Sequence, residues 1–237
     1  MQKDYLKEFN ENPKNDFIAI SEDNFIVFPK DKVNYFIEKA KKQISVDNVN
    51  DVLIGLLLLT GRRKHELLGK GRLWHIRDID VAIKETAELC PNATLNSIQS
   101  ILDRVKKWRL QPSQFLLFSC ETKTSEIVPQ PFVIPVLGES TIILERFLWL
   151  QNHLTPRSQL TSVNSDMKLL HNYGHDFAKE CCNIKVLRSL YAALFWHICN
   201  IENKNKGLIY RLILGHDIES RGTFTYYDTI LFEDDNN

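Results

Sequence analysis

One stretch of the chain, "VLIGLLLLT" at residues 52–60, limits the possible folds more than any other. A helix formed by these residues is apolar on every side, and such a helix has to be covered by other elements. The run is too short to cross a bilayer, which takes about 20 apolar residues in a helix. Asp51 can cap its start and Gly61 can end it. The run therefore predicts a buried central helix in a globular core.

Other segments with apolar residues at helical spacing are expected to surround this helix. We expect them at residues 28–44, 79–89, 94–110, 140–154, 166–182, 186–199 and 207–216. One region departs from this helical period. It contains two short runs rich in Phe, Val and Ile, "QFLLFSC" and "PFVIPVL", with a polar stretch between them. This pattern is typical of a β-hairpin. The expected fold class is mainly α with a small antiparallel β-sheet. We expect a flexible N-terminus at residues 1–16, one folded domain at 17–232 and a tail at 233–237.

Charge and cysteine content argue against several classes of protein. Lysine and arginine together number 30, as do aspartate and glutamate, so the net charge is zero. A zero net charge disfavours a general polyanion binder, but it is compatible with basic residues gathered on a single face. The 5 cysteines form no CxxC pair, which disfavours a disulfide framework and a zinc site. The polar start contains no apolar leader. We therefore expect a reduced, cytoplasmic protein with no metal and no membrane contact.

Four local motifs contain residues that could carry chemistry. In "TGRRKHEL", Arg62 and Arg63 follow the buried helix, where a rigidly held guanidinium could bind two oxygens of an anion at once. The alternative is a solvated helix end with an ion pair between Arg63 and Glu66. Lys123 lies in the expected hairpin turn, where it is either solvated or able to reach a site and donate a proton.

The other two motifs lie further along the chain. In "KVLRSLYA", Lys185 and Arg188 are three residues apart and share one face of a helix start, which is also compatible with ordinary amphipathicity. The stretch "LGHDIESRGTFTYYDTI" contains His216, Tyr226 and Tyr227. A histidine in this position is a candidate for the site or a residue that ends a helix.

Taken in order, these motifs resemble those of the tyrosine recombinase (phage integrase) superfamily over roughly residues 20–232. "TGRRKHEL" is similar to its Thr-Gly-x-Arg-x-x-Glu box, which places Arg63 at the catalytic position. Lys185 and Arg188 match its His/Lys-x-x-Arg box, and "LGH" matches the box that follows. The double arginine, the "FS…KT…IPVL" hairpin and the lysine of "KVLRSLYA" most resemble the hairpin telomere resolvases, or protelomerases. The resemblance implies the fold of a tyrosine recombinase catalytic domain.

The resemblance also implies a nucleophilic tyrosine near the end of the chain. "TFTYYDTI" is similar to the family's Thr-x-x-Tyr ending, and the frame from Thr223 favours Tyr226 as the nucleophile, with Tyr227 as the second choice. Both lie slightly further from His216 than the family's spacing, and Tyr226 departs less from it. The chemistry implied is metal-independent cleavage and rejoining of DNA through a 3′-phosphotyrosyl intermediate, without a cofactor and most closely as telomere resolution that forms hairpin ends.

In that chemistry the other residues have distinct roles. Arg63 and Arg188 would hold the non-bridging phosphate oxygens, with Lys185 and His216 assisting. Lys123 would protonate the departing 5′ oxygen.

Basic residues elsewhere are candidates for contacts to DNA. These are Arg62 and, in "DRVKKWRL", Lys106, Lys107 and Arg109, for which a solvated helix face is the alternative. The expected partner is a palindromic DNA duplex in the nucleoid, bound by a homodimer or a larger assembly.

Three alternatives remain at this point: an integrase or recombinase that acts on two duplexes, a DNA-binding relative that has lost catalysis, and an all-helical interaction protein with no nucleic-acid role, which would require every motif match to be accidental. Telomere resolvases usually carry additional regions on both sides of this domain. The chain is therefore a fragment, a minimal relative or a decayed copy.

Overall fold

Helices make up most of the described part of the molecule, and two small sheets accompany them. The computed structural model describes residues 19–20, 26–69, 71–78, 81, 114–119, 132–154, 185–199, 206–215 and 230–233. The helices are α2 (Lys32–Ile44), α3 (Val49–Thr60), α4 (Lys64–Leu68), α7 (Ser140–His153), α10 (Lys185–Cys199) and α11 (Lys206–Leu214), with a short 3-10 helix η1 (Ile76–Asp78). The strands are β1 (Ala19–Ile20), β2 (Ile26–Pro29), β3 (Arg72–His75), β4 (Phe115–Ser119), β5 (Phe132–Pro135) and β6 (Ile230–Glu233).

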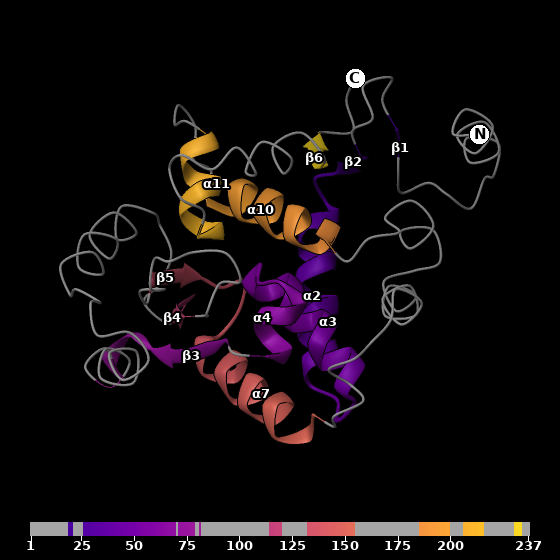
Figure 1. Ribbon diagram of the computed structural model, residues 1–237. Helices are drawn as coiled ribbons and strands as arrows, with labels where there is room; N and C mark the ends of the chain where they lie inside the picture. Colours follow the sequence, from indigo (N-terminus) through magenta and orange to yellow (C-terminus); the bar gives the residue numbers. More distant parts are fainter. Residues whose placement is uncertain are drawn as a thin grey trace.

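Helix α3 forms the centre of the fold, as its apolar run predicts. Its residues from Val52 to Thr60 are all buried. Helices α2, α7 and α10 pack against it, and Figure 1 shows them around it. Since burying one leucine side chain stabilises a fold by about 2 kcal/mol, this helix is a main source of the domain's stability.

The two ends of α3 differ in how well the sequence predicts them. Its N-cap is Asn48 and not Asp51, because the Asn48 side-chain oxygen accepts the backbone N–H groups of Asn50 (2.9 Å) and Asp51 (3.2 Å). Asp51 instead lies in the first turn, where a carboxylate is favoured by the helix dipole. The predicted C-terminal end is confirmed, since Gly61 has a φ of 63°.

The predicted hairpin is confirmed as the antiparallel pair β4 and β5, in which Leu116 lies opposite Ile134. Strand β3, which was not predicted, adds to the other edge of β4, so that this sheet has the order β3-β4-β5. All residues of β4 are buried. The sheet therefore contributes its central strand directly to the core, and it confirms the expected fold class of mainly α with a small antiparallel β-sheet.

A second sheet, of order β1-β2-β6, was not predicted. Strand β6 pairs in parallel with β2, with Ile230 opposite Ile26 and Phe232 opposite Phe28. The ring of Phe28 also lies 4.9 Å from that of Phe36 on α2. Strand β2 occupies the start of the helix predicted at residues 28–44, so that α2 begins only at Lys32. Two distant segments of the chain thus meet at one side of the molecule (Figure 1).

The remaining predicted elements fall into two groups. Those at residues 140–154, 186–199 and 207–216 are confirmed as α7, α10 and α11, with ends that shift by a residue or two. The others lie outside the described residues, namely the helices predicted at 94–110 and 166–182, almost all of the helix predicted at 79–89, and the N-terminal segment at 1–16. In the described part of the chain, no helix has the length and apolar character needed to span a membrane.

Candidate active site at the junction of α3 and α4

The turn between α3 and α4 is held in place from one side by helix α10. Gly61 adopts a left-handed conformation and donates its N–H to Leu57 O at 3.0 Å. A Cβ added at Gly61 would collide with the ring of Tyr191, so only glycine fits between the turn and α10. The Tyr191 hydroxyl donates a 2.7 Å hydrogen bond to Pro135 O on β5. These contacts fix the end of α3 against both α10 and β5.

Arg62 points from this turn into the protein interior. Its side chain is 2% exposed, its Nη2 donates to Ile213 O at 2.7 Å, and its Nε donates to Thr60 O at 3.2 Å. The guanidinium carbon lies 5.0 Å from the ring centre of Phe118 and 5.3 Å from that of Phe132. A side chain buried in this way binds the protein's own carbonyl groups. The DNA contact expected of Arg62 does not fit this position.

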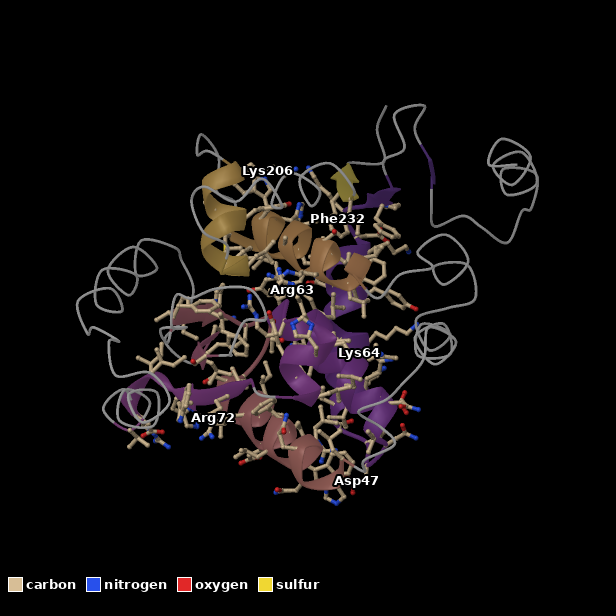
Figure 2. The ribbon with its side chains drawn as sticks, viewed as in Figure 1. Asp47, Arg63, Lys64, Arg72, Lys206 and Phe232 are labelled. Carbon is tan, nitrogen blue, oxygen red and sulfur yellow. The ribbon has the colours of Figure 1, made fainter. Side chains whose placement is uncertain are left out.

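Arg63 points the other way, and its side chain is 41% exposed. Its backbone N–H donates to Glu66 Oε2 at 2.7 Å, and its Nη1 donates to Glu66 Oε1 at 3.1 Å. The carboxylate thereby satisfies one of the N–H groups at the start of α4. The ion pair considered for this motif is therefore present, and Figure 2 shows Arg63 in the zone between α4 and α10.

Arg188 reaches the same junction from helix α10. It is 3% exposed, and its Nη1 and Nη2 donate to Gly61 O at 2.5 Å and to Leu214 O at 2.6 Å. Both acceptors lie at the C-terminal ends of helices, where carbonyl groups carry partial negative charge. The same Nη1 lies 3.9 Å from Glu66 Oε2. Arg63 and Arg188 thus converge on the two oxygens of one carboxylate.

Among the described residues of this cluster, arginines outnumber carboxylates. Burial raises the pKa of the Glu66 carboxyl, but the charges of Arg62 and Arg188 and the N–H and charge of Arg63 lower it by more, so the pKa lies below its ordinary value. Glu66 is therefore ionised at neutral pH and lies among three arginines. Such a cluster suits an additional anion, above all one with two or more oxygens.

The other predicted site residues are placed only in part. Lys185 is the first residue of α10, one helical turn before Arg188. The other candidates lie outside the described residues, namely Lys106, Lys107, Arg109, Lys123, His216, Tyr226 and Tyr227. The described residue before His216 is Gly215, which has a φ of 65° and lies against the ring of Phe132.

Sequence reasoning missed two features of the site. Neither the contact between Glu66 and Arg188 nor the inward direction of Arg62 was predicted. The Glu of the arginine box was a signal for the first, whereas no local pattern distinguishes Arg62 from Arg63. Among the described residues, no group of three or more His, Cys, Asp and Glu side chains could hold a metal ion.

Comparison with known families places the chain in one of them. The family model for the telomere resolvase ResT/TelK catalytic domain matches residues 27–229, which include the junction and Arg188. The chain belongs to this family. The resemblance inferred from the motifs is therefore confirmed. No curated protein sequence matches the chain.

Solved structures of two protelomerases have a fold similar to that of this chain. A variant of protelomerase tela in covalent complex with substrate DNA is similar to the chain with a TM-score of 0.61 at 15% identity, over 98% of this chain and 64% of that one. Protelomerase TelK in complex with substrate DNA is similar with a TM-score of 0.53 at 14% identity, over 98% of this chain and 40% of that one. This chain thus spans less than two thirds of the length of either protein.

Proposed function

We propose that this domain cleaves and rejoins DNA through a 3′-phosphotyrosyl intermediate and forms hairpin ends on a palindromic duplex, as a homodimer or larger assembly. Membership of the telomere resolvase family supports this activity. The observation that carries it is the meeting of Arg63 and Arg188, whose Nη1 atoms lie 3.1 Å and 3.9 Å from the two oxygens of Glu66. Two guanidinium groups directed at one carboxylate can also bind the non-bridging oxygens of a phosphate placed before them.

In the proposed reaction the tyrosine hydroxyl oxygen of Tyr226 attacks the phosphorus atom, and the bond from phosphorus to the 5′ oxygen breaks. The phenol proton passes to a neighbouring base, for which His216 is the candidate, and Lys123 donates a proton to the departing oxygen. A 5′ hydroxyl of the opposing strand then attacks the phosphotyrosine, which closes the hairpin and releases the phenol.

The basic residues have complementary roles in this proposal. Arg63 and Arg188 stabilise the negative charge that develops on the phosphate oxygens, and Lys185 assists them from the first turn of α10. Lys106, Lys107 and Arg109 bind backbone phosphates away from the reacting bond, where contacts position the duplex without reading its sequence.

The covalent intermediate provides the first test. A duplex nicked beside the scissile phosphate loses the short leaving fragment, so the protein stays attached to DNA and migrates as a shifted band under denaturing conditions. We expect trapping by the wild type and by Tyr227→Phe, and none by Tyr226→Phe. If Tyr226→Phe traps DNA and Tyr227→Phe does not, the nucleophile is Tyr227. If the wild type does not trap, the proposed chemistry is wrong.

The product provides the second test. An intact palindromic duplex is incubated with the protein, and the products are separated on a denaturing gel. Hairpin formation gives covalently closed ends that renature at once, whereas exchange between two duplexes gives recombinant linear strands. The second result would assign the domain to strand exchange.

A further inference from the structure

The C-terminal end of α11 is held by two arginines from two different elements. Arg62, in the turn after α3, donates to Ile213 O at 2.7 Å, and Arg188, on α10, donates to Leu214 O at 2.6 Å. The last carbonyl groups of a helix have no partner within the helix and carry partial negative charge. Two adjacent carbonyls are here satisfied by two cations, which fixes both the position and the rotation of the helix end.

We propose that Arg62 is a positioning residue for strand transfer, which fixes the end of α11 and the point from which the chain continues into His216. This inference rests on the proposed function. Arg62 does not contact DNA itself, because its side chain is 2% exposed. Its effect passes through the described end of α11, at Leu214 and Gly215, to the segment that follows.

The ring of Phe132 completes this anchor. The guanidinium carbon of Arg62 lies 5.3 Å from the ring centre, and a Cβ added at Gly215 would collide with the same ring. Strand β5, the turn after α3 and the end of α11 are therefore packed together at one point. Gly215 lies against this ring and has a φ of 65°, the left-handed conformation that commonly follows the last residue of a helix.

Only an arginine can make this set of contacts. Its Nε and Nη2 donate to Thr60 O and Ile213 O at the same time, because the planar guanidinium directs its donors at fixed angles. Its flat faces also suit the rings of Phe118 and Phe132. A lysine would retain the charge but has a single ammonium group, which cannot hold both carbonyls in one plane.

The test compares Arg62→Lys and Arg62→Met with the wild type. Ile44→Ala is a control that lowers stability where α2 packs in the core, away from the junction, because Ile44 is 2% exposed. Each protein is compared at a temperature equally far below its own melting point. Three quantities are measured: hydrogen exchange of the backbone amides of residues 208–215 without DNA, the affinity for the duplex, and the single-turnover rate of covalent trapping.

We expect both Arg62 variants to exchange faster at residues 208–215 and to trap DNA about tenfold to a hundredfold more slowly, since misplacement by about 1 Å has effects of that size. Their DNA affinity should stay close to that of the wild type, and Ile44→Ala should match the wild type in all three quantities. Unchanged hydrogen exchange at residues 208–215 in Arg62→Met overturns the inference. A lower affinity for the duplex with an unchanged trapping rate also overturns it, because that result is expected of a residue that contacts a DNA phosphate.

Hydrogen exchange is measured without DNA, so the proposed anchoring of α11 by Arg62 and the proposed function can fail separately. If the wild type traps no DNA, the proposed function is wrong and with it the role of Arg62 in strand transfer. Faster exchange in Arg62→Met would then still establish Arg62 as the anchor of α11.

Discussion

Arg62 and Arg63 are neighbours in the sequence, yet they belong to two different regions of the molecule. We call the contacts of Arg62 with Thr60, Ile213, Phe118 and Phe132 the inner half of the junction. The contacts of Glu66 with Arg63 and with Arg188 form the outer half. Arg62, at the centre of the inner half, is 2% exposed, whereas the Arg63 side chain is 41% exposed. The backbone explains the difference, because Arg63 is extended (φ −82°, ψ 151°) and successive side chains in extended backbone point to opposite sides.

The two halves differ in how far the stability of the fold depends on their arginine. In the inner half the guanidinium is part of the core, so any change there alters stability and position together. In the outer half the exposed arginine contributes charge to the site, and the fold depends little on it. Changes to Arg63 should therefore separate activity from stability, and changes to Arg62 should not.

The largest effect is expected for Arg63→Ala. We expect covalent trapping to become about a hundred- to thousand-fold slower, because a donor to the developing phosphate charge is lost. The free energy of unfolding should fall by only about 1 kcal/mol, since the Arg63 side chain is 41% exposed and the buried Glu66 keeps the backbone N–H of residue 63 and the charge of Arg188. Single-turnover trapping and denaturant unfolding measure the two quantities.

The matched control for this change is Arg77→Ala. Arg77 is also an exposed arginine beside a carboxylate, with its Nε 3.8 Å from Asp78, but it lies outside the junction. Trapping at the wild-type rate by Arg63→Ala, or an equal decrease in Arg77→Ala, would contradict the role of the outer half.

The next effect concerns the turn that separates the two halves. Gly61→Ala should lower the free energy of unfolding by about 2–4 kcal/mol, because an alanine is strained in the left-handed region and its Cβ collides with the Tyr191 ring. Denaturant unfolding measures this loss. Gly138→Ala is the control, since a Cβ there meets Ile143 Cδ1 at an ordinary 3.5 Å. Equal stability of the two variants would show that the turn tolerates a side chain.

Glu66, which joins Arg63 to Arg188, gives a prediction about pH. Because the pKa of Glu66 is lowered in the folded protein, its ionised carboxyl stabilises the folded state. This stabilisation is complete at pH values above the ordinary pKa of 4.5, and it is lost as the pH falls through the lowered pKa. Glu66→Gln should thus be less stable than the wild type by about 1–3 kcal/mol at neutral pH, and the difference should shrink in acid. Unfolding curves between about pH 3 and about pH 7 measure it. A difference that is constant with pH would contradict this assignment.

These comparisons also show how far the sequence predicts the site. The buried helix α3, its glycine end and the positions of Arg63 and Arg188 in their boxes follow from local patterns. The inward direction of Arg62 does not, because it depends on where the phenylalanines of β4 and β5 lie. For the same reason the contact between Glu66 and Arg188 depends on the packing of α10 against α3, which joins two distant parts of the chain.

The elements that were missed have similar causes. Asn48 and Asp51 are both good N-cap residues, so the start of α3 could not be decided from residue type. The parallel pairing of β2 with β6 joins segments far apart in the chain, and the short strands lack a pattern that specifies a partner. The part of the site built from local sequence was predictable, and the part built from long-range contacts was not.

The smallest effect is expected for Tyr191→Phe, which keeps the ring beside Gly61 and removes only the hydroxyl. Burial raises the pKa of the Tyr191 phenol, so the group is protonated and donates to Pro135 O at neutral pH. Loss of this hydrogen bond should lower the free energy of unfolding by about 1 kcal/mol, whereas the trapping rate should not change, because the ring still supports the turn. Tyr35→Phe, at a 49% exposed position, is the control and should affect neither quantity. A slower rate in Tyr191→Phe would mean that the link from α10 to β5 helps to align Arg63 and Arg188, and the boundary between the two halves would then have to include β5.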